Sequence, residues 1–192
     1  MADMEAWQAV WRPVIEAVGA ALDDVEPDFG ADVIEAGAVR RYLEPLEFDC
    51  ALHNDPDVAR RYGHPDVIAP YTALSTFALP PMRRPGEVLF ASAEASAQPV
   101  RSVLKSSFPD YFPPFTASFA TDLEIDFIRP ARLGERLRRQ NRRLLACEPK
   151  ATRVGRGAFL TIGSQIANQA GEVLAILKNG SYLYTPHGEG QG

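Results

Sequence analysis

The 192-residue chain has little cysteine, no excess of positive charge and no long uninterrupted apolar run. Its two cysteines, Cys50 and Cys147, are far apart and show neither a metal-ligand nor a redox spacing, so we expect two reduced thiols. The net charge of −5 argues against general affinity for nucleic acids, because such affinity requires a basic excess.

Membrane and export signals are also lacking. The longest apolar stretch, VIAPYTALSTFALPP, is too short and too interrupted by proline to span a bilayer. The opening residues, MADMEAWQAVWRPVIEAVG, carry acidic side chains where a signal peptide carries basic ones. His64 and His187 have no neighbours spaced as metal ligands. We therefore expect a cytoplasmic protein that binds no metal, no nucleic acid and no membrane.

Helical patterns occupy the N-terminal half. Residues 4–22 place apolar side chains at the spacing of an amphipathic helix, which Pro13 must kink or divide. Residues 38–46 predict one or two helical turns. A further short helix should begin at Pro56, directly after Asp55, which has the side chain of an N-cap.

A buried helix is predicted from Tyr71 to Leu79, where the sequence is YTALSTFAL. Pro80 and Pro81 must end it after about two and a half turns, because proline lacks a backbone donor and clashes with the preceding turn. Residues 80–116 are rich in proline, serine and alanine and predict a long irregular segment. Segments of this length in a compact domain are usually functional or mobile.

The C-terminal half has the two-residue period of β-strands. Leu123, Ile125 and Phe127 alternate with other residues in the first of them. Three long stretches joined by short turns follow: RLRRQNRRLLACEP, GAFLTIGSQIANQ and EVLAILKNGSYLYTP. The sequence QAG between the last two predicts a hairpin, so the three stretches form an antiparallel meander.

Helices followed by a meander predict an α+β fold, with one helix buried against one face of an antiparallel sheet. We expect a helical extension over residues 1–30 and one domain over residues 31–186. Residues 187–192 should form a disordered tail.

Three segments carry a family resemblance: AVRRYLEPLEFDCALHNDPDVARRYGHPDVIAP, LEIDFIRPARLGERL and GAFLTIGSQIANQAGEVLAI. In their order and spacing they resemble the MaoC-like hot dog dehydratases, in particular the FAS1-like or N-terminal MaoC dehydratase domain. The resemblance covers residues 33–185. It implies a hot dog fold, an antiparallel sheet wrapped around a central helix that is shortened here, and half of a double hot dog.

The resemblance also implies a thioester substrate, on coenzyme A or acyl carrier protein, and no other cofactor. The expected reaction is the reversible addition of water to a 2-enoyl thioester, which gives an (R)-3-hydroxyacyl product. A carboxylate and a histidine must hold the water between them, and a backbone N–H must polarise the thioester carbonyl.

The family's D-x-N-P-x-H motif aligns with FDCALH in this sequence. Its histidine falls on His53, but its aspartate falls on Phe48, which cannot take a proton. Asp49 is acidic but lies one position away. Asp49 and His53 are therefore the candidate catalytic pair, and we interpret them as a remnant of the motif.

The oxyanion donor also departs from the family pattern. The family opens its central helix with H-G, and the matching residues here are Ala69 and Pro70. Pro70 has no N–H to donate, so Tyr71 or Thr72 would have to replace it. Ala69, Pro70, Tyr71 and Thr72 are the candidate substrate-binding residues.

These departures favour a non-catalytic, pocket-shaping subunit of a MaoC-like enoyl-CoA hydratase that acts on a bulky acyl thioester, of long-chain or steroid side-chain type. Its partner would be a second hot dog subunit with an intact motif, in a heterodimer or heterotetramer. Three alternatives stay open. One is an autonomous, homodimeric hydratase that uses Asp49 and His53, and another is a hot dog that only binds acyl thioesters. A thioesterase is disfavoured, because YTALSTFAL offers no carboxylate or histidine.

Two features bear on the acyl pocket. The early stop at Pro80 and Pro81 leaves room for a bulky group, unless the segment PDYFPPF refills the space. The arginine-rich run RLRRQNRR, residues 136–143, could touch phosphates of the carrier, but we favour the solvated face of a strand.

Overall fold

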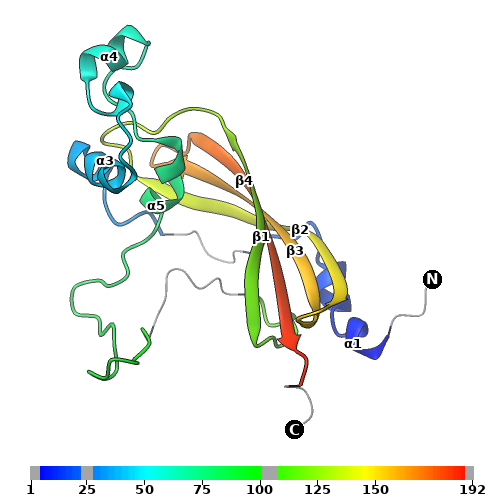
Figure 1. Ribbon diagram of the computed structural model, residues 1–192. Coiled ribbons are helices and arrows are strands. Elements are labelled where there is room, and N and C mark those ends of the chain that lie inside the picture. Colours follow the sequence, from blue (N-terminus) through cyan, green and yellow to red (C-terminus); the bar gives the residue numbers. More distant parts are fainter. Residues whose placement is uncertain (1–4, 23–27, 101–107, 189–192) are drawn as a thin grey trace.

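The computed structural model describes residues 5–22, 28–100 and 108–188 of the chain. Four strands form one antiparallel sheet: β1 (Ala117–Phe127), β2 (Leu137–Thr152), β3 (Gly155–Asn168) and β4 (Val173–Pro186). Their order across the sheet is β1-β4-β3-β2, so β2, β3 and β4 form the predicted meander and β1 lies beside β4 (Figure 1). The predicted α+β class is confirmed.

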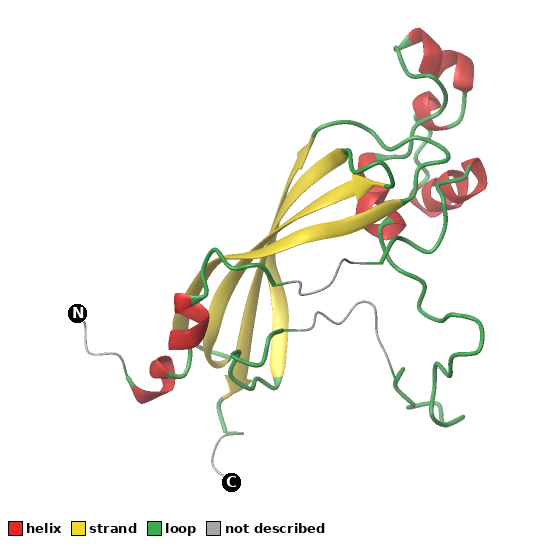
Figure 2. Cartoon of the chain, turned by 180° about the vertical axis from the view of Figure 1, so that it is seen from behind, coloured by secondary structure: helices red, strands yellow, loops and turns green. Residues whose placement is uncertain are grey.

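Short helices flank the two ends of the sheet. They are α1 (Ala6–Ala9), α2 (Arg12–Glu16), α3 (Ala36–Leu43), α4 (Pro56–Arg61) and α5 (Leu74–Phe77), with 3₁₀ turns η1 (Glu44–Leu46), η2 (Ala51–His53) and η3 (Tyr71–Ala73). α1 and α2 lie at one end of the sheet and α3, α4 and α5 at the other (Figure 2). Within the described residues, no helix combines the length and the apolar character that a bilayer crossing requires.

A tight turn between β3 and β4 confirms the predicted hairpin. The Asn168 side-chain oxygen accepts bonds from the N–H groups of Ala170 and Glu172, both at 3.0 Å. Gly171 has a φ of 83°, a conformation that glycine adopts without the steric cost of a side chain.

The N-terminal segment forms two helices, α1 and α2, within the helical pattern predicted over residues 4–22. Proline lies in the first turn of α2, which agrees with a division at Pro13. The prediction was wrong beyond Glu16, because residues 19–22 pair with the outer edge of β2. There the Gly19 N–H donates to the Leu144 carbonyl at 2.7 Å.

The middle helices follow their local signals. The predicted turns over residues 38–46 are α3 and η1. Asp55 caps α4 as predicted, since its side chain accepts bonds from the N–H groups of Asp57 and Val58 at 2.8 and 3.1 Å. Pro56 is the first residue of α4.

The central helix is shorter than predicted. η3 and α5 together span Tyr71 to Phe77, whereas the predicted helix reached Leu79. α5 lies against one end of the sheet instead of along its length (Figure 1). The described parts of residues 80–116 contain no helix and no named strand, as predicted, apart from one isolated bridge between Phe90 and Pro99.

Two separate apolar cores cover the inner face of the sheet, which is the face that carries Leu160 and Ile166 of β3. The first core, at the α5 end, includes Leu74, Ala78, Leu137, Ile166 and Leu177. The second core, at the other end, includes Trp11, Val14, Leu144, Leu160 and Leu183 and is covered by Phe108, Tyr111, Phe112 and Phe115. The segment PDYFPPF therefore refills part of the space that the short helix leaves.

A charge network ties the loop between β1 and β2 to the turn between β3 and β4. Arg129 donates to both carboxylate oxygens of Glu135, at 2.7 and 3.1 Å, and to Glu172 at 2.6 Å. Glu135 also accepts bonds from the Asn168 side chain at 2.9 Å and from the Arg132 N–H at 2.8 Å. The residues IRPARLGE thereby close the sheet at this end.

Glu135 makes the stability of the chain depend on pH. Burial raises the pKa of its carboxyl group, but hydrogen bonds from Arg129, Asn168 and Arg132 outweigh burial and hold the pKa below its ordinary value. The stabilisation is therefore complete above the unfolded-state pKa of about 4.3 and is lost as the pH falls through the lower, folded-state pKa. We predict that Glu135→Gln lowers the free energy of unfolding by about 2–3 kcal/mol at neutral pH.

Urea unfolding at a series of pH values from about 7 to about 3 measures this contribution. Glu135→Gln should show a smaller loss of stability on acidification than the wild-type chain. Glu124→Gln is the matched control, because the Glu124–Lys178 pair is exposed and should add little. An equal effect of the two substitutions would contradict the role of the network.

Gly30 lies where the chain passes between the end of α5 and the start of β2. Its N–H donates to the Leu137 carbonyl at 2.6 Å, and a Cβ there would collide with the carbonyl of Phe77. We predict that Gly30→Ala lowers the free energy of unfolding by about 1–3 kcal/mol. Gly37→Ala, in α3 with open space around the glycine, should raise it by about 0.5–1 kcal/mol. Thermal unfolding compares the two variants, and wild-type stability of Gly30→Ala would show that the close approach has no energetic consequence.

Candidate functional site

The candidate catalytic pair lies at the helical end of the molecule, where η2 leads into α4 (Figure 1). His53 is half-buried, and its Nδ1 lies 2.7 Å from the carbonyl oxygen of Ile68. Because a carbonyl oxygen can only accept, Nδ1 carries the proton, and Nε2 is unprotonated in the neutral ring. The ring of Phe48 has its centroid 5.9 Å from that of His53.

Asp49 lies on the surface beside this ring pair. Its side chain forms no hydrogen bond or ion pair with His53 or with any other residue that the structure describes. Phe48, at the position of the motif aspartate, is 50% exposed. Asp49 and His53 are thus close in sequence without forming a bonded pair, and their status as a remnant stays a prediction.

The four candidate substrate-binding residues lead from a buried bend into η3. Ala69 is fully buried, and its N–H is already engaged by a backbone carbonyl at 2.9 Å. Pro70 is the N-cap of η3, so the first amides of the turn belong to Tyr71 and Thr72. Tyr71 is exposed, and its ring packs against Phe127 of β1 with a centroid separation of 4.7 Å. Tyr71 and Thr72 are therefore the two that present a backbone donor near the surface.

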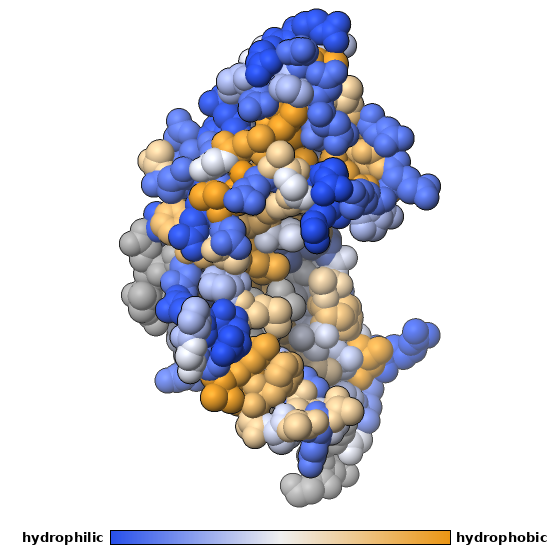
Figure 3. All heavy atoms as spheres, turned by 90° about the vertical axis from the view of Figure 1, so that its left-hand side faces the viewer, coloured by the Kyte–Doolittle hydropathy of each residue, from blue (hydrophilic) through white to orange (hydrophobic). Residues whose placement is uncertain are grey.

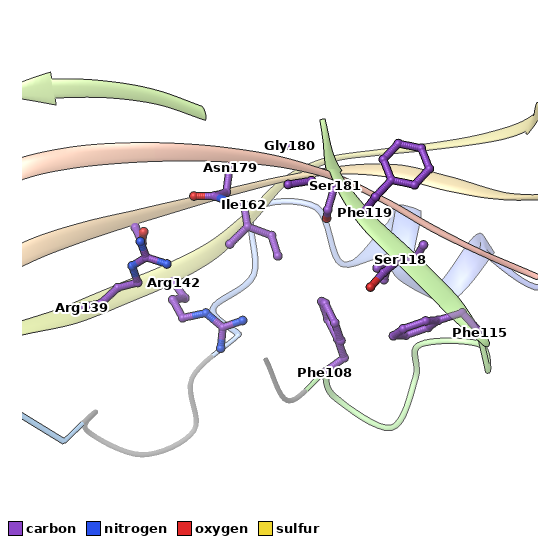
Figure 4. A pocket seen from close by; sticks show the side chains of 13 residues that line it. Phe108, Phe115, Ser118, Phe119, Arg139, Arg142, Ile162, Asn179, Gly180 and Ser181 are labelled. Carbon is purple, nitrogen blue, oxygen red and sulfur yellow. The ribbon is translucent and has the colours of Figure 1, made fainter. Parts of the chain in front are cut away.

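A pocket of about 400 Å³ lies over the middle of the inner face, between the two cores. It is lined by residues of all four strands and of the segment before β1: Phe108, Phe115, Ser118, Phe119, Ala120, Arg139, Arg142, Ile162, Ser164, Asn179, Gly180, Ser181 and Leu183. We call it the inner-face pocket. Figure 4 shows Arg139 and Arg142 at one end and the rings of Phe108 and Phe115 at the other.

None of the four candidate substrate-binding residues lines this pocket, although Arg139, Arg142 and Phe115 belong to the two segments that the sequence related to the carrier phosphates and the acyl space. The sequence signal that could have revealed the pocket is the presence of serine, asparagine and arginine at inward positions of strands that are otherwise apolar there. The expectation of a solvated strand face was wrong for Arg139 and Arg142, since both line the pocket. Arg139 shares the inner face with Leu137, and a bulge between Gln140 and Arg143 shifts the register so that Arg142 faces inward as well. Arg138, the neighbouring residue, lies over the ring of Phe29 at 4.7 Å.

The cysteines and possible metal ligands are separate from this pocket. Both cysteines are free thiols, and burial raises the pKa of Cys147 to about 11, so that its nucleophilic thiolate form is scarce at neutral pH. No group of three or more metal-ligating side chains occurs in the described ranges.

Residues 25–177 match the family described as FAS1-like, dehydratase domain region. No curated protein sequence matches the chain significantly. Among solved structures, a chain of the ChsH1-ChsH2 complex from Mycobacterium tuberculosis is similar with a TM-score of 0.66 and 18% identity, over 95% of this chain and 98% of that one.

Two further structures show the same arrangement. A MaoC-like dehydratase from Rhodospirillum rubrum is 20% identical with a TM-score of 0.56, over 88% of this chain and 93% of its own. A chain of the HadBC (3R-hydroxyacyl-ACP dehydratase) complex from Mycobacterium tuberculosis is 12% identical with a TM-score of 0.52, over 86% and 96%. These likenesses confirm the predicted hot dog fold. Because the family match spans most of its length, the chain belongs to the FAS1-like dehydratase domain family of MaoC-like hot dog proteins.

Proposed function

We propose that this chain is the pocket-shaping half of a MaoC-like hydratase or dehydratase for bulky acyl thioesters. A second hot dog subunit supplies the catalytic aspartate and histidine, in a heterodimer or heterotetramer. The substrate is a 2-enoyl thioester of coenzyme A or acyl carrier protein, with a long-chain or steroid-type acyl group. The observation that carries this proposal is an open pocket of about 400 Å³ on the inner face of a chain whose motif lacks its aspartate.

The chemistry supports a division of labour between two subunits. Hydration adds the hydroxyl group of water to C3 of the enoyl group and a proton to C2. The site therefore needs a base for the water, an acid for C2 and a donor for the thioester oxygen. Phe48 cannot act as the base, and Pro70 has no N–H for the oxygen. This chain would hold the acyl group while its partner transfers the protons.

Strand β1 supports the pairing, because it forms an open edge of the sheet. It bonds to β4 on one side and to no described strand on the other. Apolar side chains lie exposed on this edge and next to it, among them Leu123, at 54%, and Ile128, at 58%. Figure 3 shows apolar side chains in two areas of one face of the molecule. An open edge beside exposed apolar groups favours association with a second sheet.

The solved relatives add support for such an assembly, since two of them are complexes, ChsH1-ChsH2 and HadBC.

The outer edge of β2 is a poorer site for a partner. Residues 19–22 already bond to it, through Gly19 at Leu144 and through Leu22 at Arg142. Pairing through β1 therefore leaves the covered edge undisturbed.

The inner-face pocket supports a bulky acyl group. α5 ends before it, and Phe108 and Phe115 cover only one side. Its volume of about 400 Å³ lies within the range of pockets that bind small molecules, about 300–1,000 Å³.

His53 favours a second candidate, an autonomous hydratase that acts as a homodimer. Because its Nδ1 donates to the Ile68 carbonyl, Nε2 is available to take a proton, and Asp49 would be the accompanying carboxylate. A third candidate, a hot dog that binds acyl thioesters without turning them over, shares the pocket but predicts no catalysis with any partner.

The test of the proposed function combines this chain with a hot dog subunit that carries an intact D-x-N-P-x-H motif, sought first in the neighbouring gene. We expect light scattering to show a mixed complex. That complex should hydrate a long-chain or ring-bearing enoyl-CoA with a higher kcat/KM than crotonyl-CoA, because binding energy from the remote acyl group increases catalysis. Equal kcat/KM values would remove the argument from the pocket, and a stable monomer that ignores the partner would contradict the pairing.

Substitutions at the candidate pair separate the first two candidates. Loss of a true general acid or base costs about a hundredfold to ten-thousandfold in rate. We predict that His53→Ala and Asp49→Asn each change kcat of the assembled enzyme by less than about tenfold. The matching substitutions in the partner serve as the positive control and should abolish turnover. If either substitution in this chain abolishes activity while assembly survives, the autonomous reading replaces the first.

A further inference from the structure

The floor of the inner-face pocket is polar, although both cores beside it are apolar. Ser118, Ser164, Asn179 and Ser181 occupy positions along the strands that line the pocket. Ser164 is 6% exposed, and its side chain bonds to no other residue that the structure describes. Buried polar groups are costly unless they meet a polar partner. The floor therefore fits a ligand that carries polar atoms as well as an apolar body.

Arg139 enters this pocket from β2 without a counter-charge. Its side chain donates from Nη2 to the Ser75 hydroxyl at 3.4 Å, and no carboxylate in the described part of the chain pairs with it. Burial lowers the pKa of its guanidinium, and the positive charge of Arg142 lowers it further. A partly buried guanidinium without a carboxylate is unfavourable, and an anionic ligand would relieve it through short, charge-assisted bonds.

The other end of the pocket is apolar and aromatic. The rings of Phe108 and Phe115 meet edge to face, with centroids 5.8 Å apart, and Ile162 lies between them and the arginines (Figure 4). A ligand that fills the pocket therefore meets a cation at one end and rings at the other. This arrangement matches an amphipathic anion.

The direction of the pocket relates this cation to the proposed substrate. The lining runs from Ser118 on β1, across β4 and β3, to Arg139 on β2. Ser118 is opposite Leu183 of β4, which pairs with Ala158 of β3, whereas Arg139 is opposite Ile166, so the lining crosses the sheet diagonally. If the catalytic partner sits at the open β1 edge, the thioester end of the substrate lies near β1 and the distal end of the acyl group reaches Arg139.

We propose that the inner-face pocket binds an acyl group that ends in a carboxylate, and that Arg139 pairs with this carboxylate while Phe108 and Phe115 contact the apolar body. This inference rests on the proposed function and adds the chemical class of the acyl group to it. Arg139 is a specificity-determining residue on this account. The phosphates of the carrier share the anionic chemistry, so the test includes them as competitors.

Titration calorimetry on the assembled complex tests this assignment with decanoate, which has a carboxylate on an apolar chain, and with decan-1-ol as its neutral counterpart. We expect decanoate to bind at least about tenfold more tightly than decan-1-ol, since a charge-assisted hydrogen bond contributes that much. Arg139→Met should remove the preference, and Arg139→Lys should keep part of it. Phe108→Ala should weaken both ligands alike.

Arg153→Met is the matched control, because it removes the same charge from the exposed turn between β2 and β3 and should keep the preference. Thermal unfolding checks that Arg139→Met folds, as expected from its single long bond to Ser75. Equal binding of decanoate and decan-1-ol, or a preference that survives Arg139→Met, would overturn the assignment. Displacement of decanoate by adenosine 3′,5′-bisphosphate would assign the site to the carrier instead and would also overturn it.

Failure of this inference and failure of the proposed function give different results. A complex that hydrates an uncharged long-chain enoyl-CoA but shows no preference for decanoate overturns only the carboxylate assignment. A chain that prefers decanoate through Arg139 but shows no turnover with its partner keeps the binding site and loses the hydratase function.

Discussion

The apolar inner face of the sheet needs a cover, and no single element of this chain is long enough to provide it. α5 ends at Phe77 and covers only the end that holds Leu137 and Ile166. The opposite end is covered by Trp11 and Val14 of the N-terminal helices and by the aromatic segment before β1. The middle stays open, and the inner-face pocket lies there. The short helix thus determines the two cores, the long aromatic segment and the cavity between them.

Arg129 and Arg139 differ in whether a described carboxylate pairs with their positive charge. Hydrogen bonds to Glu135 and Glu172 raise the pKa of Arg129, whose charge is matched and which closes one end of the sheet. Burial lowers the pKa of Arg139, which has no described carboxylate beside it. The ion pairs of Arg129 join two loops and so stabilise the fold. A cation that no described carboxylate pairs with inside a pocket is available to an anionic ligand, which is the reason for the carboxylate assignment.

The two edges of the sheet differ in the same way. The edge at β2 is bonded by residues of the N-terminal segment, whereas the edge at β1 has no described partner and exposes apolar side chains. The pocket spans the sheet between these edges. A second subunit at β1 would therefore close both the edge and the near end of the pocket. In the proposed assembly, the departures at Phe48 and Pro70 would not need to be compensated within the chain.

Much of this structure follows from local sequence signals. The strands alternate in polarity, Asp55 caps α4 through its own side chain, and Gly171 permits the turn before β4. The departures at Phe48 and Pro70 are equally local, since a missing carboxylate or N–H is visible in the residue itself. The family resemblance, the fold class and the expectation of a defective motif therefore needed no coordinates.

Other features depend on contacts between segments distant in the sequence. Residues 19–22 leave their helical pattern to bond with β2, and the chain near Gly30 packs against the end of α5. The inward side of Arg142, three residues after the inward-facing Arg139, depends on a bulge in the pairing of β2 with β3. A shift of one residue reverses every side chain that follows, and no local propensity specifies where the shift occurs. The composition of RLRRQNRR was therefore evident from the sequence, but its place inside a pocket was decided by strand pairing.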